Sequence, residues 1–484
     1  MSSPFNEAKY KALLEGLEIT ILNKSEAFDP FFKARIDPEF YQKLYIKIQS
    51  EILAKDHDLI SNIALITDGE HGNAITYPEG YSKYYGARNV LQGILRDNAV
   101  EFITKEHHEK LKKTALKPRD VLISCVGANI GSASIVPDNI GIANIVRNVA
   151  LIRSKTEFKN EYLLAYFRSF YGKNLYYRMN TGNAQPLVSL DYINTIPVFK
   201  PSIELQELIK QLISGSLAKD VESKQIYQEA EALFLEKLVL GKFEPCREPV
   251  NIKGFKESFL STGRLDAEYY QKKYEDYLNL VQNFSGGFDA LGHVCKLKDT
   301  NYTPDEKKEY KYIELANVGR TGDITGCTTA LGCELPSRAG RIVSTNDVII
   351  SSIEGSLGSC AIVPPEYNSA LCSTGFYVIS STKINSETLL VLFKSEPMQN
   401  ILKQNCSGTI LTAINKNEFQ KIPVPLIDKA VQELIKGKLT ESFQLKRQSE
   451  QLLESAKRAV EIAIEQTEQV AVDYIREYCF SNAD

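Results

Sequence analysis

Two long stretches of the chain carry apolar residues at three- and four-residue spacing, which predicts amphipathic helices. The first runs from about residue 202 to 240, with Leu205, Leu208 and Leu212 on one face, and the second runs from about 427 to 478. At 1.5 Å per residue these helices would measure about 55 and 75 Å. Because each apolar stripe needs a partner, the pattern favours an antiparallel coiled coil within the chain over two unrelated surface helices.

Short β-rich runs, separated by Gly, Asn and Pro, precede each of the long helical stretches. The predicted strands are 121–126, 130–136 and 146–152 in the first half, and 348–353, 357–363 and 375–379 in the second. A helical string follows each group, beginning near Tyr162 and Leu389. Strands followed by a helix predict an α+β domain in each half.

These patterns divide the chain into five segments. We expect an N-terminal helix and lead-in at 1–30, a first α+β domain at 31–201, a central helix at 202–245, a second α+β domain at 246–426, and a C-terminal helix at 427–484. A chain of 484 residues is too long for a single core, so two domains agree with its length.

Three strings of the first half return in the second half in the same order. The strings that begin at Arg35, Asp120 and Ile196 return at Arg264, Asp347 and Ile422, which by subtraction are 229, 227 and 226 residues further on. A duplicated unit predicts pseudo-two-fold symmetry. Such symmetry suits a ligand that itself has two halves, as a DNA duplex does.

Charge is distributed unequally between the two halves. The net charge is −4, yet residues 60–200 carry 17 Lys and Arg against 12 Asp and Glu, whereas residues 286–425 carry 13 against 14. Nucleic-acid binding is therefore better supported by the first half than by the second.

Cysteine usage and hydropathy indicate an intracellular protein. The nine cysteines are scattered without zinc-ligand spacing, as in a chain with reduced thiols. The sequence has no apolar run of about eighteen residues and no secretory pattern at its start, so we expect a cytoplasmic location.

The sequence lacks the common catalytic motifs. It has no Gly-x-x-x-x-Gly-Lys phosphate loop, no Asn-Pro-Pro-Tyr methyltransferase string, no Gly-x-Ser-x-Gly elbow and no His-Glu-x-x-His helix. His107 and His108 lie in a charged stretch, which favours a solvated helix over a site. We therefore expect a non-catalytic chain that holds no cofactor or metal of its own.

Polar loops carry the residue types that contact DNA. Arg and Asn side chains can bind guanine and adenine edges, while Lys, Ser and Thr hold phosphates. The alternative for the loop around Tyr84 is an exposed segment with aromatic anchors. The candidate DNA-binding residues are Lys83, Tyr84, Tyr85, Arg88, Asn89, Arg147, Asn148, Asn183 and Gln185 in the first half, and Lys307, Lys308, Asn317, Arg320, Thr374 and Thr409 in the second.

The chain resembles the specificity subunits of type I restriction-modification enzymes. The resemblance rests on the order domain, helix, domain, helix, on residues 120–137, 144–153 and 373–378, and on Gly408-Thr409 leading to 421–425 and the string that begins at Gln432. It covers nearly the whole chain. Each motif alone is loose, but the set occurs twice in order.

The resemblance implies two target recognition domains that bind the two halves of a split DNA sequence. It also implies a coiled coil that fixes the spacer and docks two adenine methyltransferase subunits, with motor-nuclease subunits as possible further partners. S-adenosylmethionine would then be bound by the methyltransferase partner, and the chain itself would be non-catalytic.

Two other classes of protein remain open at this point. A duplicated interaction scaffold of a defence complex would not touch DNA. A stand-alone nucleic-acid enzyme would need a catalytic constellation that the sequence lacks.

Overall fold

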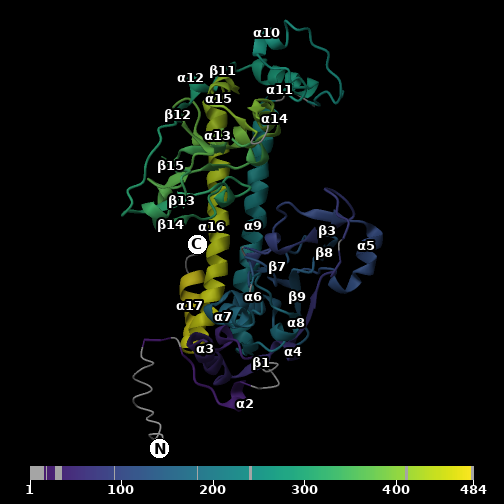
Figure 1. Ribbon diagram of the computed structural model, residues 1–484, viewed down its shortest axis with the longest axis vertical. Coiled ribbons are helices and arrows are strands. Elements are labelled where there is room, and N and C mark those ends of the chain that lie inside the picture. Colours follow the sequence, from purple (N-terminus) through teal and green to yellow (C-terminus); the bar gives the residue numbers. More distant parts are fainter. Residues whose placement is uncertain are drawn as a thin grey trace, which may run out of the picture. The chain divides into compact units, whose positions relative to one another are not determined.

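The computed structural model describes residues 16–17, 19–27, 35–72, 74–91, 93–182, 184–238, 243–408 and 412–480. The chain forms two compact units, one made of residues 1–219 and 447–484 and the other of residues 220–446. Each unit contains one α+β domain and part of both long helices (Figure 1). The predicted N-terminal helix lies almost wholly outside the described residues.

The main sheet of unit 1 has the strand order β2-β9-β6-β7-β4. Its central strand β6 (Val121–Ser124) is buried along its whole length because both faces are covered. Val121 and Ile123 pack into the core beneath the helices, whereas Leu122 packs into a second apolar cluster on the other face. The remaining strands are β2 (Ala64–Asp68), β9 (Val149–Ser154), β7 (Ala133–Ile135) and β4 (Gly93–Ile94).

A smaller sheet of order β5-β3-β8 lies in the same unit. Its central strand β3 (Ser82–Tyr85) pairs antiparallel with β5 (Glu101–Ile103) and parallel with β8 (Ala143–Ile145). Tyr85 from β3 packs with Leu122 in the second apolar cluster, so this cluster holds the two sheets together.

The domain of unit 2 repeats this topology. Its main sheet has the order β12-β19-β16-β17, and its smaller sheet has the order β14-β13-β18-β15. Strand β13 pairs antiparallel with β14 and parallel with β18, as β3 does with β5 and β8. The predicted α+β class is confirmed in both halves. The bounds are β12 (Lys296–Lys298), β19 (Phe376–Ser380), β16 (Val348–Ser351), β17 (Cys360–Ile362), β14 (Thr328–Leu331), β13 (Glu309–Ile313), β18 (Leu371–Ser373) and β15 (Ala339–Ile342).

Paired helices cover the main sheet of each domain. In unit 1 these are α6 (Asn160–Arg168) and α7 (Phe170–Arg178), and in unit 2 they are α13 (Ser386–Lys394) and α14 (Glu396–Gln404). A two-stranded pair closes each domain by joining its beginning to the Ile-Pro-Val string at its end. These pairs are β1 (His57–Leu59) with β10 (Pro197–Phe199), and β11 (Phe288–Ala290) with β22 (Pro423–Pro425).

Short elements complete the domains. They are α2 (Lys24–Ala27), η2 (Pro38–Tyr41), α3 (Lys43–Leu53), α4 (Ile60–Ile63), η3 (Ala87–Asn89), α5 (Lys105–Lys110), η4 (Lys112–Thr114) and α8 (Leu190–Ile193) in unit 1, and α10 (Phe259–Thr262), α11 (Lys272–Gln282), α12 (Leu291–Val294), η5 (Leu315–Asn317), η6 (Gly332–Glu334), η7 (Glu354–Ser356), η8 (Pro365–Tyr367), β20 (Cys406–Ser407), β21 (Ala413–Ile414) and α15 (Lys416–Lys421) in unit 2.

The two long helices are α9 (Ile203–Leu238) and α16 (Lys429–Glu465), and they pair antiparallel inside each unit. In unit 1 the buried Ser216 and Ser449 hydroxyls are 2.9 Å apart, and in unit 2 the Ser223 and Ser442 hydroxyls are 3.2 Å apart. Small side chains let the helix backbones approach closely, and each hydroxyl finds a partner in the seam. The predicted coiled coil is confirmed.

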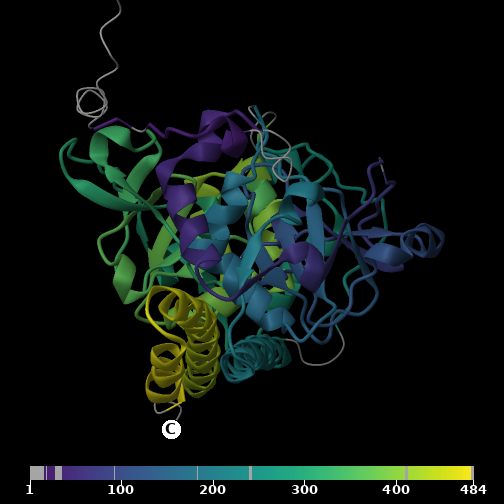
Figure 2. The ribbon, with the colours of Figure 1, turned by 90° about the horizontal axis from the view of Figure 1, so that it is seen from below.

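The C-terminal helix is shorter than its apolar pattern suggested. It ends at Glu465, and Thr467 starts the new helix α17 (Glu468–Tyr474) by accepting a hydrogen bond from the Val470 amide at 3.3 Å. A π-helical stretch, η9 (Ile475–Phe480), follows. Figures 1 and 2 show α17 beside the last turns of α16, and its apolar face joins the unit 1 core. The apolar pattern of the sequence continues past Glu465 because α16 and α17 both bury apolar residues. Periodicity alone therefore could not reveal the break between these two helices.

None of the described helices is long and apolar enough to span a membrane.

Candidate nucleic-acid interface

The same turn follows the central strand of the smaller sheet in both units. In unit 1 the string from Lys83 to Asn89 ends in η3, and in unit 2 the string from Lys311 to Asn317 ends in η5. The Asn89 Oδ1 atom accepts a hydrogen bond from the Gly86 amide at 3.0 Å, and the Asn317 Oδ1 atom accepts one from the Glu314 amide at 2.8 Å. Both asparagines therefore close a turn, a role that the shared Lys-Tyr-x-x-x-x-Asn string could have revealed.

Three candidates of the first half are buried. Tyr85 and Asn89 are fully buried and Tyr84 is 4% exposed. The Tyr85 hydroxyl donates to the Asp97 carboxylate at 2.5 Å, and the Asn89 amide donates to two backbone carbonyls, those of Arg96 and Asn98. Burial, with a smaller contribution from the Glu70 carboxylate, raises the pKa of Tyr84 to about 12. These side chains stabilise the domain, which corrects the hypothesis that they contact bases.

Basic side chains around this turn lie at the surface. Lys83 pairs with Asp97 at 2.7 Å and Arg88 pairs with Glu101 at 3.2 Å. Such exposed pairs are weak, so both cations remain accessible to a phosphate.

Three further candidates of the first half lie in turns. Arg147 is exposed in the turn after β8, whereas the neighbouring Asn148 accepts a hydrogen bond from the Ala87 amide at 3.2 Å. Gln185 is exposed. Arg147 and Gln185 are thus placed to reach a ligand, while Asn148 helps to hold the η3 turn.

Two histidines that the sequence placed on a solvated helix make specific contacts. The His107 Nε2 atom lies 2.6 Å from the Glu70 carboxylate, and the His108 Nδ1 atom lies 3.0 Å from the Ser82 hydroxyl. The helix α5 that carries them has no buried residue, as predicted for a solvated helix, although both rings are partly buried. The ring of Tyr81, which is exposed, lies beside His108. These pairings could not be predicted from local spacing, because each partner comes from a distant strand or loop.

The candidates of the second half lie around the strand β13. Lys307 and Lys308 are exposed, and the Lys308 ammonium lies over the Tyr310 ring at 5.3 Å. Arg320 is exposed in the turn that follows Asn317, and Thr374 is half-buried, with its amide bonded to the Arg338 carbonyl. The exposed side chain of Arg338 was not among the candidates.

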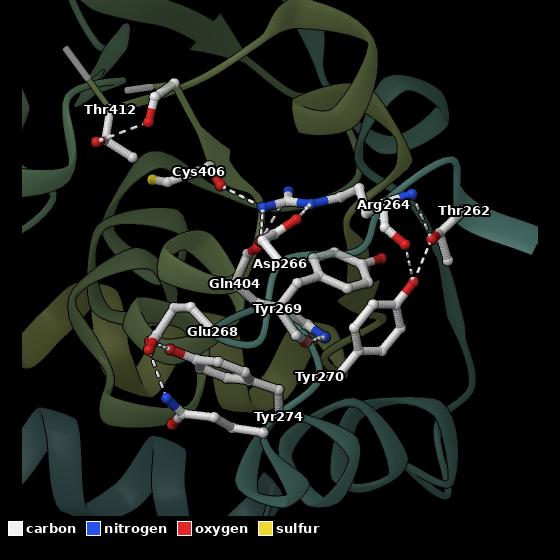
Figure 3. A network of polar contacts seen from close by, with 12 residues as sticks. Thr262, Arg264, Asp266, Glu268, Tyr269, Tyr270, Tyr274, Gln404, Cys406 and Thr412 are labelled. Carbon is white, nitrogen blue, oxygen red and sulfur yellow. Dashed lines mark hydrogen bonds and ion pairs between the residues drawn. The ribbon is translucent and has the colours of Figure 1, made fainter. Parts of the chain in front are cut away.

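The remaining two candidates, Asn183 and Thr409, lie outside the described residues. The start of the loop that contains Thr409 is held by Arg264, whose Nη2 atom donates to the Cys406 carbonyl at 2.8 Å (Figure 3). The same guanidinium forms a two-pronged pair with Asp266 and lies 4.3 Å from the centre of the Tyr269 ring. The hydrogen bonds from Arg264 hold the pKa of Asp266 below its usual value.

An equivalent network stands before the loop that contains Asn183. Arg35 pairs with Asp37, lies 4.5 Å from the centre of the Phe40 ring, and donates to the Asn180 carbonyl at 2.7 Å. The matched strings at Arg35 and Arg264 thus hold the backbone at Asn180 and at Cys406.

The described residues contain no group of three or more His, Cys, Asp or Glu side chains arranged to hold a metal ion. The cysteines whose surroundings are described are free thiols.

The second half of the chain is similar to a known protein family. Residues 288–455 match the family described as the type I restriction modification DNA specificity domain. A comparison with curated proteins gives no match.

Two solved structures illustrate the likeness. The S subunit of the type I restriction-modification system from M. genitalium is 14% identical, with 87% of this chain and 95% of that chain covered and a TM-score of 0.35. The HsdS subunit from Thermoanaerobacter tengcongensis is 15% identical, with 87% and 96% covered and a TM-score of 0.25. Such TM-scores do not define a common arrangement of domains. Residues 288–455 are thus similar to the DNA specificity domain of type I restriction modification systems, in agreement with the resemblance found in the motifs.

Proposed function

We propose that this chain is the specificity subunit of a type I restriction-modification complex and binds a split DNA target through its two α+β domains. One observation carries the proposal: the domain of unit 2 matches a DNA specificity family, and the domain of unit 1 has the same strand order in both sheets except for the edge strands β4 and β15. A repeated recognition domain with different surface residues suits a target whose two halves differ in sequence.

The surface chemistry supports phosphate contacts in both domains. Arg88 and Arg147 are exposed in unit 1, and Lys307 and Arg338 are exposed in unit 2. Arginine and lysine at the surface neutralise phosphates and release counterions, so binding would weaken steeply as salt rises.

The chain would direct partner subunits rather than act on DNA itself. Two adenine methyltransferase subunits would bind it and supply S-adenosylmethionine, and motor-nuclease subunits would join where the system restricts. A cytoplasmic location follows from this role.

Mapping of methyladenine tests the proposal. The chain is purified alone and with the methyltransferase encoded beside it, and each preparation is incubated with genomic DNA and S-adenosylmethionine. We expect no methylation by the chain alone and methylation at one bipartite sequence by the mixture. Methylation without sequence preference, or a mixture that does not associate, would contradict the proposal.

Two outcomes would identify the other classes of protein. A partner complex that is stable to salt and has no DNA affinity at low salt indicates an interaction scaffold. Modification or cleavage of DNA by the chain alone indicates an enzyme.

A further inference from the structure

A tight turn in unit 2 connects the closed turn at Asn317 to the strand β14. Val318 pairs with Ile324 across this turn, and the Gly319 amide donates to the Asp323 carbonyl at 2.8 Å. Gly322 has a φ of +83°, and a Cβ atom there would lie 2.5 Å from the Leu390 side chain of α13. The turn is therefore pressed against the helix layer and has little freedom to move.

The side chain of Asp323 joins this turn to the long helix α16. Its Oδ2 atom lies 2.6 Å from the Nζ atom of Lys446, and the two side chains are only 18% and 16% exposed. The Thr321 hydroxyl donates to the other carboxylate oxygen at 2.6 Å, and Lys446 also approaches that hydroxyl at 3.4 Å. Each charged group thus has a partner on the opposite element.

The Asp323–Lys446 pair has a defined geometry, because the ion pair and the Thr321 hydrogen bond together orient the carboxylate. Burial alone would raise the pKa of Asp323, but the Lys446 ammonium together with the hydrogen bonds to the carboxylate holds that pKa below its usual value. When one partner of a shielded pair is removed, the other charge is left poorly solvated. The turn and α16 are therefore held in one register as long as both charges are present.

The first domain contacts the long helices through other side chains. Arg119 has a φ of +69° and donates from its Nη1 atom to the Ser214 hydroxyl of α9 at 3.0 Å. The same side chain pairs with Asp138 at 2.6 Å at the surface of the domain. Arg168 of α6 also pairs with Glu454 of α16 at 2.7 Å. The first domain is thus linked to both long helices.

We propose that Lys446 and Asp323 are positioning residues that fix the second recognition domain on the helix pair and so restrict the spacer length that the complex accepts. The inference rests on the proposed function. The carrying observation is that the turn which continues from η5, beside the candidate DNA-binding residues Asn317 and Arg320, is joined to α16 by the ion pair of Asp323 with Lys446.

The test measures spacer tolerance. Once the bipartite target is mapped, duplexes are made with the native spacer and with one or two base pairs added or removed. The full complex with the methyltransferase is assayed with Lys446→Met, Lys446→Arg and Lys438→Met. The Lys438 variant is the matched control, because its ion pair with Glu229 at 2.7 Å joins the two long helices without touching the domain.

We expect Lys446→Met to raise methylation of duplexes with altered spacers, relative to the native spacer, by about tenfold or more, because small errors of orientation have large kinetic effects. Lys446→Arg should restore the preference of the wild type, and Lys438→Met should retain it. A general loss of stability would instead lower the rates on all duplexes together and would leave their ratios unchanged.

Two outcomes separate the inference from the proposed function. An unchanged spacer ratio in a folded Lys446→Met complex overturns the inference, whereas absence of site-specific methylation by the wild-type complex overturns the proposed function. If Lys446→Met does not fold, Asp323→Asn replaces it, because the amide is isosteric and removes only the charge. A spacer ratio that does not change in Asp323→Asn overturns the inference in the same way.

Discussion

Arg178 in unit 1 and Gln404 in unit 2 lie at the end of equivalent helices. Each donates a hydrogen bond to a backbone carbonyl, but from a different kind of side chain. The Arg178 Nε atom donates to the Phe40 carbonyl at 2.8 Å, and the Gln404 Nε2 atom donates to the Tyr269 carbonyl at 3.1 Å. Burial lowers the pKa of Arg178 to about 10. The duplication has therefore preserved a hydrogen bond to the backbone while the residue that makes it has changed.

The same comparison extends to the surroundings of Arg35 and Arg264. Both arginines pair with an aspartate two residues on and hold the backbone before a polar loop. Arg35 is 7% exposed, whereas Arg264 is half-buried. The framework is thus common to both units, but it is more deeply buried in the first.

The largest expected effect concerns the cores, where the units should respond alike. Phe167 and Phe393 occupy equivalent helices and are fully buried. Their replacement by Ala should each cost about 3–5 kcal/mol of unfolding free energy in the unit that contains the residue. Hydrogen exchange of each unit during denaturant titration measures this. A large loss in one unit and a negligible loss in the other would show that the two cores are not equivalent.

The arginine networks should respond unequally. Arg35→Ala should cost about 2–3 kcal/mol and Arg264→Ala about 1–2 kcal/mol, because hydrogen bonds to charged groups contribute more when water is excluded. Denaturant unfolding of both variants checks the order. Lysine at either position should restore little of the lost unfolding free energy, since it lacks the planar guanidinium that bonds the carboxylate with two nitrogens. Equal losses would contradict the role assigned to burial.

The next largest losses of unfolding free energy are expected for the turn-closing asparagines. Asn89→Ala removes three hydrogen bonds of a fully buried side chain and should cost about 2 kcal/mol, whereas Asn317→Ala should cost about 1 kcal/mol. The DNA affinity of the folded fraction should stay unchanged for Asn89→Ala. A selective loss of binding at one base position would return Asn89 to the candidate DNA contacts.

The aspartates of the arginine networks should make stability depend on acid pH. Burial opposes ionisation of Asp37, but its hydrogen bond and ion pair with Arg35 lower its pKa, and the hydrogen bonds from Arg264 lower the pKa of Asp266. A lowered folded pKa adds stability above about pH 4 that is lost as pH falls through the folded value. Because both carboxylates are partly exposed, each contribution should stay below about 1 kcal/mol. Urea titrations from pH 6 to pH 2 should show a shallower fall for Asp37→Asn and Asp266→Asn than for the wild type.

Surface cations should have the smallest effect on stability. Arg147→Ala and Arg338→Ala should change the unfolding free energy by less than about 0.5 kcal/mol. Each should lower the slope of log affinity against log salt by about 1 if it contacts a phosphate. Fluorescence anisotropy at several salt concentrations gives the slopes. An effect in unit 1 alone would confine phosphate binding to the domain whose sequence is basic.

Periodicity and repetition were sufficient to predict the organisation of the chain. The apolar runs around Val121 and Val348 became the central strands of the main sheets, and the stripes around Leu205 and Ile435 became the paired helices. These features follow from local spacing, because burial of one face requires apolar residues at fixed intervals. The repeated strings indicated the duplication without any knowledge of the fold.

The candidate contacts could not be separated into framework and surface from the sequence. Lys83 and Tyr85 lie on the same face of one strand. Lys83 is nevertheless half-exposed, whereas Tyr85 is buried in the second apolar cluster. Likewise, His107 finds Glu70 only after distant segments have met. The break before α17 depends on packing against unit 1 in the same way.

The sequence by itself determined two α+β domains and a pair of amphipathic helices, since these depend on patterns within short windows. Only the tertiary structure decided which polar residues close turns, as Asn89 and Asn317 do, and which face outward, as Arg147 and Arg338 do. It also decided that Asp323 meets Lys446. The physical reason is that exposure and ion pairing depend on which distant segments cover a side chain, and spacing along the chain does not carry that information.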